Sequence, residues 1–100
     1  MEIKDIVRKA HDNAVKHGFW DPPLPFGTAI ALIHSELSEA LEEERAGNPV
    51  HYYPCNAVEL ADAVIRIADL CGHLGIDLDA VIEEKMAYNA DRPYKHGKRF

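Results

Sequence analysis

The sequence has few cysteines, no long apolar run and no excess of positive charge. Its two cysteines, Cys55 and Cys71, lack the C-x-x-C spacing, so neither a redox motif nor a disulfide framework is predicted. Cys71 falls on the apolar side of a predicted helix, where we expect it to pack as a small hydrophobe. No apolar segment approaches the roughly 18 residues of a membrane span. Charges at Glu2, Lys4 and Asp5 interrupt any signal-like run, so we expect a cytoplasmic protein.

The net charge also limits the function classes. A formal charge of −6 argues against a general binder of nucleic acids or of anionic membranes. The basic residues are not evenly spread, because Arg92, Lys95, Lys98 and Arg99 lie in the last nine positions. A length of 100 residues with 47% apolar residues is typical of one globular domain, which we assign to residues 1–100.

Apolar residues recur at helical spacing in four segments, which are separated by glycine and proline. The pattern predicts an all-α fold, an antiparallel bundle of four main helices. The predicted helices cover about residues 2–16, 28–45 and 56–73, and a fourth runs from Asp77 or Asp79 to about residue 91.

The predicted helix over residues 56–73 is apolar round most of its circumference, which is typical of a buried helix. Its four charged residues fall on one strip about 80° wide. They are Glu59, Asp62, Arg66 and Asp69. Buried carboxylates are costly without a positive partner, and Arg66 can balance only one of the three. We therefore expect a bound cation, or a basic group from another element, beside this strip.

Two helices each carry a pair of acids three residues apart, Glu36 with Glu39 and Glu59 with Asp62. Residues at this spacing are neighbours on a helix and can reach one ion. Four oxygen ligands on facing helices suit Mg²⁺, with Mn²⁺ as an alternative. Glu59 also stands three residues after Asn56, so it could instead belong to a capping box. That alternative does not account for Asp62.

Basic and amide groups on the predicted fourth helix complement these acids. Lys85 and Asn89 lie four apart on its inward side, and Arg92 follows one turn later. Such groups suit the oxygens of a polyphosphate. The alternative is a lysine whose stem packs on the core while its amine reaches water.

Two large aromatic residues lie in the proline-rich segment 17–26, where a helix interior is forbidden. Phe19 and Trp20 either close the end of the bundle or line a pocket for a flat ligand, since aromatic faces stack on bases. Under the second interpretation, His17 and Trp20 contact the substrate.

These motifs together resemble the MazG-type all-α nucleoside triphosphate pyrophosphohydrolases. The resemblance covers about residues 28–100 and rests on four stretches of sequence. They are IALIHSELSEALE from Ile30, ELAD from Glu59, KMAYN from Lys85 and RPYKHGKRF from Arg92. It implies hydrolysis of a nucleoside triphosphate between the α and β phosphates, with Mg²⁺ bridging the triphosphate.

Carried over by position, the resemblance assigns the metal to Glu36, Glu39, Glu59 and Asp62. Lys85 and Asn89 would hold phosphate or sugar. Glu36 or Glu39 would act as the catalytic base, and Arg92 would help to stabilise the leaving pyrophosphate. The chain departs from the E-E-x-x-E motif at its first acid, where Ser35 stands, and Glu43 is the candidate replacement.

The resemblance also implies a homodimer or a dimer of dimers. The sequence supports this independently, because a chain of 100 residues can hardly cover a helix that is apolar on so many sides.

Three alternatives compete with this function. A non-enzymatic, dimerising regulatory module would use the acid strips as interface ion pairs. A related pyrophosphohydrolase, such as the phosphoribosyl-ATP type, would keep the site and change the substrate. A di-iron oxidase needs Glu-x-x-His on two helices, and neither acid pair is followed by a histidine at that spacing.

Overall fold

Helices account for all the regular secondary structure in the described part of this computed structural model, residues 1–47 and 56–97. The elements are α1 (Ile3–Lys16), α2 (Phe26–Arg45), α3 (Asn56–Leu74), α4 (Leu78–Ala90) and a short 3₁₀ turn, η1 (Tyr94–Gly97). The predicted all-α class with four main helices is confirmed. None of the helices in these two ranges is both long and apolar enough to cross a membrane.

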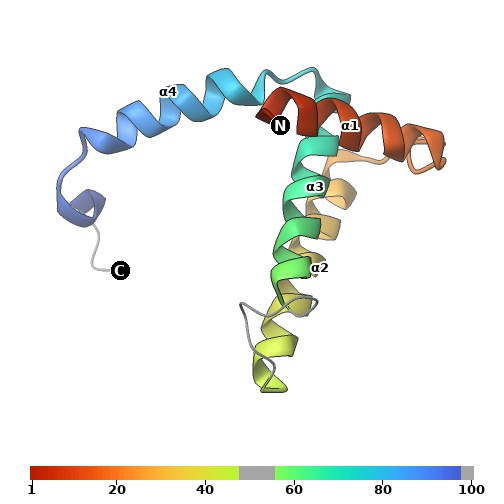
Figure 1. Cartoon of the computed structure of the whole chain (residues 1–100), viewed down its shortest axis with the longest axis horizontal. Helices are drawn as coiled ribbons and strands as arrows, with labels where there is room; N and C mark the ends of the chain where they lie inside the picture. The colour runs from red at the N-terminus through yellow and green to blue at the C-terminus, as the bar shows by residue number, and fades with distance from the viewer. Residues whose placement is uncertain (48–55, 98–100) are drawn as a thin grey trace.

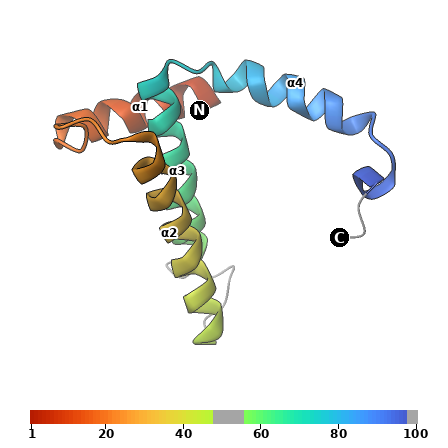
Figure 2. The ribbon, with the colours of Figure 1, turned by 180° about the vertical axis from the view of Figure 1, so that it is seen from behind.

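α3 is the central helix of the fold. It lies antiparallel beside α2 along most of its length, and α1 crosses its C-terminal half (Figures 1 and 2). The antiparallel pair of α2 and α3 agrees with the predicted bundle. The small core forms where these three helices and the loop after α1 meet; it contains Ala14, Trp20, Ala29 and Leu70, with Leu24, Ile30 and Ile33 packed against them.

A polar network fixes the loop after α1 to the end of α3. The Asp69 carboxylate accepts hydrogen bonds from the Trp20 indole nitrogen at 2.8 Å and from His11 Nδ1 at 2.9 Å. The Trp20 ring also stacks on His73, with the ring centroids 3.8 Å apart. Trp20 is therefore a core residue that closes this end of the helical assembly, as the packing interpretation predicted.

The prediction that the third helix is buried is wrong for a single chain. Five large apolar residues of α3 are 40–53% exposed, namely Leu60, Val64, Ile65, Ile67 and Leu74. The buried residues of this helix are smaller on average: Ala63, Ala68, Leu70 and Cys71. The reason is that α1 and α2 cover only two sides of α3. The buried position of Cys71 agrees with its expected role as a small hydrophobe, and burial raises the pKa of its thiol.

α4 extends away from the pair of α2 and α3 like an arm (Figure 1). The chain turns at Gly75, whose φ of 70° is a conformation that favours glycine. Asp77 then caps α4 by accepting a hydrogen bond from the Ala80 amide at 3.2 Å. The radius of gyration is 15.8 Å, whereas a compact domain of this length has about 13 Å. Within one chain, α4 therefore does not complete the predicted four-helix bundle.

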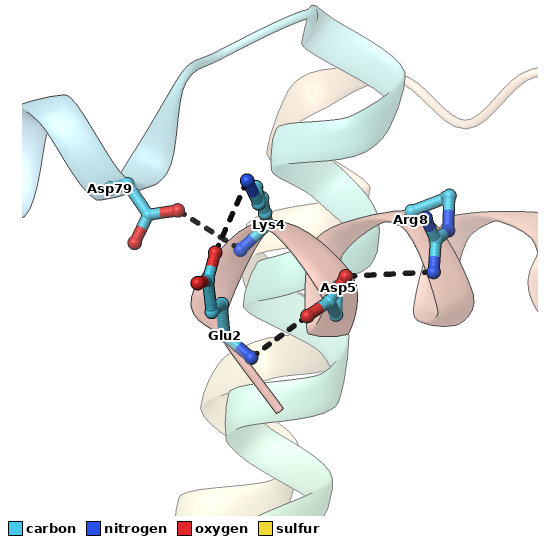
Figure 3. A network of polar contacts seen from close by, with 5 residues as sticks. All are labelled: Glu2, Lys4, Asp5, Arg8 and Asp79. Atoms are coloured by element: carbon cyan, nitrogen blue, oxygen red, sulfur yellow. Dashed lines mark hydrogen bonds and ion pairs between the residues drawn. The ribbon is translucent and has the colours of Figure 1, made fainter.

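The root of α4 is attached to the first turn of α1. Asp79 accepts a hydrogen bond at 3.0 Å from the backbone amide of Lys4, which has no partner within its own helix (Figure 3). Asp5 accepts from the backbone amide of Glu2 at 2.9 Å and lies 3.6 Å from the Arg8 guanidinium. The bond between Lys4 and Asp79 is exposed and involves only the first turn of α4. α4 is therefore held at its start rather than along its length.

α1 approaches α3 closely at Gly72, so one added methyl group there should destabilise the protein measurably. In Gly72→Ala the new Cβ would lie 2.6 Å from His11 Cβ, so one of the two helices must shift. We expect the free energy of unfolding to fall by about 1–3 kcal/mol, although alanine is otherwise the better helix former by about 1 kcal/mol. Urea unfolding followed by circular dichroism measures this change.

Gly27→Ala is the matched control, because it also lies in a helix but its new Cβ has no neighbour within 4 Å. We expect this variant to be as stable as the natural protein or slightly more stable. Equal stability changes in the two variants would contradict the assigned packing of α1 on α3.

Candidate metal and substrate site

Three of the four predicted metal ligands come together where α2 lies against the start of α3. Glu36 from α2 and Glu59 and Asp62 from α3 each place a carboxylate oxygen within 4.8 Å of the others. Residues 59 and 62 share one face of α3, and the antiparallel pairing turns that face toward the middle of α2. The sequence spacing therefore identified side chains that the fold brings together.

Glu39, the fourth predicted ligand, joins this group through Glu59. A hydrogen bond between the two carboxyl groups, partial removal of Glu59 from water and the charge of Glu39 raise the pKa of Glu59 to about 7. Smaller contributions come from Glu36 and Asp62. The hydrogen bond with Glu39 is the largest cause of this raised pKa, and repulsion from the charges of Glu39 and Asp62 acts in the same direction.

Glu36 is the buried member of the group, with a relative exposure of 7%. Its Oε1 accepts a hydrogen bond from Arg66 Nε at 2.7 Å. This ion pair bridges α2 and α3 and supplies the one positive partner that the strip on α3 offers. Sequence spacing had placed Arg66 on the strip but could not name Glu36 as its partner.

The chemistry of these donors fits a hard divalent cation. The four predicted ligands, Glu36, Glu39, Glu59 and Asp62, are all carboxylates, with no thiolate or imidazole among them. Mg²⁺ and Mn²⁺ prefer such oxygen ligands, whereas zinc sites favour sulfur and nitrogen. A cation at this place would also relieve the repulsion that raises the pKa of Glu59.

Ser35 stands where the E-E-x-x-E motif has its first acid, and its hydroxyl is bonded within its own helix rather than to the acid group. Ser35 donates its hydroxyl to the backbone carbonyl of Leu32 at 2.6 Å, a bond within its own helix. Glu43, the candidate replacement, borders a shallow hollow of about 320 Å³ together with Glu39 and Glu59. Glu43 is thus on the same side of the site, one turn beyond Glu39.

A cavity of about 530 Å³ adjoins the acids. Glu36, Asp62 and Arg66 line one part of it, and the rest of the wall is mainly apolar. That remaining wall consists of Ala10, Asn13, Ala14, Phe19, Leu24, Leu32, Ile65 and Asp69. The volume is in the usual range for small-molecule sites. The arrangement offers an acidic end and an aromatic wall in one continuous space.

The aromatic residue on this cavity is Phe19 and not Trp20. Phe19 is 65% exposed, and its ring stacks on His17 with the centroids 6.5 Å apart. His17 Nδ1 in turn donates to the backbone carbonyl of Asn13 at 2.8 Å. The predicted substrate residue His17 does not line the cavity itself but contacts two residues that do, Phe19 and Asn13. Of these two, the sequence analysis had proposed only Phe19 as a pocket residue.

The structure does not bring the predicted groups of α4 to the acids of the same chain. Lys85 Nζ lies 4.5 Å from the centre of the Tyr88 ring, and Arg92 Cζ lies 5.5 Å from it. Asn89 Oδ1 is buried and has no hydrogen-bond partner among the described residues. Because α4 extends away from α2 and α3, these three residues gather at a separate place in the chain (Figure 1).

The chain matches no protein-family model, and neither a curated protein nor a solved structure matches it. The resemblance to the MazG-type enzymes therefore rests on the motif residues alone.

The raised pKa of Glu59 predicts how the cation-free protein responds to pH. The folded protein holds this proton up to a pH of about 7, whereas the ordinary value of the group is 4.5. Between these values the folded state binds more protons than the unfolded state, so stability falls as pH rises. We expect the melting temperature in a chelator to decrease from pH 5 to pH 7.5.

Glu59→Gln should flatten this decrease, because the side chain no longer titrates. Glu44→Gln, at an exposed position near the end of α2, should keep the slope of the natural protein. Identical slopes in the natural protein and in Glu59→Gln would contradict the assigned repulsion.

Proposed function

We propose that the protein is a Mg²⁺-dependent nucleoside triphosphate pyrophosphohydrolase that removes unwanted nucleotides from the cellular pool. It hydrolyses a nucleoside or deoxynucleoside triphosphate between the α and β phosphates, which gives the monophosphate and pyrophosphate. The single observation that supports this most strongly is the meeting of acids from α2 and α3 at the edge of a cavity with an aromatic wall. The motif resemblance supplies the reaction type.

The ligands of the metal would be Glu36, Glu39, Glu59 and Asp62. When bound, Mg²⁺ neutralises phosphate charge and makes water more acidic, and Mn²⁺ has the same chemistry. Carboxylates alone would repel a triphosphate, so this cation is also what allows the substrate to approach the acidic end of the cavity.

Glu39 and Phe19 have the remaining roles in the proposed reaction. Glu39 is exposed, in contrast to the ion-paired Glu36, so Glu39 is the better candidate for the base that accepts the proton of the attacking water. The new bond forms between the water oxygen and phosphorus as the bond to the bridging oxygen breaks. Phe19 provides a face on which the base can stack, with apolar walls beside it.

A second copy of the chain would complete the site. The chain exposes 7618 Å², whereas a compact monomer of its mass exposes about 5,700 Å². Exposed large apolar residues, which share a face on each helix by their spacing, account for part of the excess: Leu37 and Leu41 on α2, and Leu60, Val64 and Ile67 on α3. These five residues are the exposed face. A homodimer, or a dimer of dimers, would cover this face and could deliver α4 with Lys85, Asn89 and Arg92 to the acids of the partner.

The exposed face equally favours one alternative, a non-enzymatic dimerising module. Such a module would need the apolar face but not the meeting of acids from α2 and α3. The phosphoribosyl-ATP reaction would use the same acids on another substrate, and a screen of nucleotide substrates separates it from the proposed reaction.

The enzymatic proposal predicts that two acids are required for activity. Glu39→Gln and Asp62→Asn should each lower Mg²⁺-dependent pyrophosphate release by about 100-fold or more. The measurement is a screen of common and modified nucleoside triphosphates that records pyrophosphate and orthophosphate separately. Circular dichroism should show unchanged helicity in both variants.

Glu44→Gln serves as the control and should retain full activity, because residue 44 is exposed and lies outside the acid group. Full activity in Glu39→Gln or Asp62→Asn would refute the assignment. Absence of pyrophosphate release from every substrate, in a protein that still dimerises, would favour the regulatory module.

The dimer predicts that one charge on the exposed face disrupts assembly. Val64→Glu places a carboxylate at a 53% exposed apolar position of α3 and should shift the protein to monomers in analytical ultracentrifugation. Val15→Glu is the matched control, since Val15 on α1 is also 53% exposed but lies outside this face. Equal sedimentation of the two variants would exclude this face as the interface.

A further inference from the structure

Arg66 occupies an unusual position for a basic residue, because it stands inside the acidic site. It follows Asp62 by one turn on the same strip of α3 and lines the cavity beside Asp62 and Glu36. Its side chain is 42% exposed, while the side chain of its partner Glu36 is only 9% exposed. The arginine thus reaches from the cavity into the buried part of the site.

The contact with Arg66 balances the buried negative charge of Glu36. A carboxylate as buried as Glu36 needs a positive partner or a loss of charge, and Arg66 Nε supplies the positive partner at 2.7 Å. The bond uses Nε alone. A guanidinium has further N–H donors on its two terminal nitrogens, and no hydrogen bond links these to another residue in the described ranges.

We propose that Arg66 is an internal counter-cation that holds Glu36 until Mg²⁺ binds and then transfers to a phosphate oxygen of the substrate. This inference rests on the proposed function, since it concerns the same acids and the same cavity. It assigns to Arg66 a positioning role before the substrate arrives and a binding role afterwards.

Charge balance is the reason for the exchange. Glu36, Glu59 and Asp62 would hold the divalent cation, whose two positive charges would balance the Glu36 carboxylate in place of the guanidinium and would repel Arg66. The released guanidinium remains at the cavity wall, where a triphosphate would place its oxygens. Arginine binds phosphate through two parallel hydrogen bonds, which its planar fork allows.

The exchange has a defined effect on the binding of the metal and on the binding of the triphosphate. Without nucleotide, Arg66 competes with the metal and weakens its binding. With a triphosphate present, Arg66 gains a phosphate partner, so metal and phosphate bind cooperatively. Any fixed positive charge acts with opposite sign on a cation and on an anion, so the exchange differs from a closed ion pair in one respect: the bond from Arg66 Nε to Glu36 opens when Mg²⁺ binds.

The test compares two affinities in Arg66→Gln. Binding of Mn²⁺ alone, followed by electron paramagnetic resonance of the free ion, should become about tenfold tighter, because one positive charge leaves the site. Binding of inorganic triphosphate at saturating Mg²⁺, measured by calorimetry, should become about tenfold weaker or more, because a charge-assisted contact is lost. Arg8→Gln removes a surface ion pair with Asp5 and should change neither affinity.

Unchanged or weaker Mn²⁺ binding in Arg66→Gln would overturn the exchange while leaving the proposed enzyme intact. Failure of the natural protein to bind Mn²⁺ at all would instead overturn the proposed function, and the exchange with it.

A measurement on the natural protein covers the case in which Arg66→Gln does not fold. The NMR signal of the Arg66 Nε–H group, assigned by its loss in Arg66→Lys, should shift on addition of Mg²⁺ as its bond to Glu36 opens. An Nε–H signal that stays in place at saturating Mg²⁺ would overturn the proposal.

Discussion

The antiparallel contact between α2 and α3 forces like charges together, and the candidate site depends on this constraint. Packing the two helices along their small and apolar residues turns Glu36 and Glu39 toward Glu59 and Asp62. Among the described residues, one basic side chain forms an ion pair with this group, that of Arg66 with Glu36. A stable fold could easily avoid such an arrangement by exchanging one acid for a neutral residue. Its presence is the strongest physical reason to look for a cation there.

The N-terminal and C-terminal halves of α3 carry residues with different roles. Its N-terminal half carries the acids, while its C-terminal half carries Asp69 and His73, which hold Trp20 and α1 in place. The cavity lies between these two regions and touches residues of both, from Asp62 to Asp69. The position of α1 therefore sets one wall of the space that a substrate would enter. A change that loosens α1 would alter the cavity without touching any acid.

The sequence predicted the acid group well because helical spacing alone places residues 36, 39, 59 and 62 on narrow strips. It also predicted the four helices, and it named Asp77 and Asp79 as the two candidate caps of α4, of which the structure uses Asp77, because glycine, proline and capping residues act locally. The partner of Arg66 was not predictable, since it depends on the register of two helices that are distant in sequence.

The orientations of the two loop aromatics and the partner of α4 also could not be predicted from the sequence. Phe19 and Trp20 are adjacent, yet one faces the cavity and the other is buried; composition cannot distinguish the two directions in an irregular loop. Helical spacing places Lys85 and Asn89 on one side of α4, but it cannot tell whether that side contacts the same chain or a second copy. For the same reason the apolar surface of α3 was expected to be buried, although one chain leaves much of it exposed.

Trp20 is the one tryptophan of the chain, so the tryptophan fluorescence of this protein comes from a single place. Its indole is hydrogen-bonded to Asp69 and lies face to face with the His73 imidazole. Its emission therefore records whether α1 and α3 are joined, and it lies about two helical turns of α3 from the acids. An intrinsic optical signal of this kind separates loss of the fold from loss of the site, without any added label.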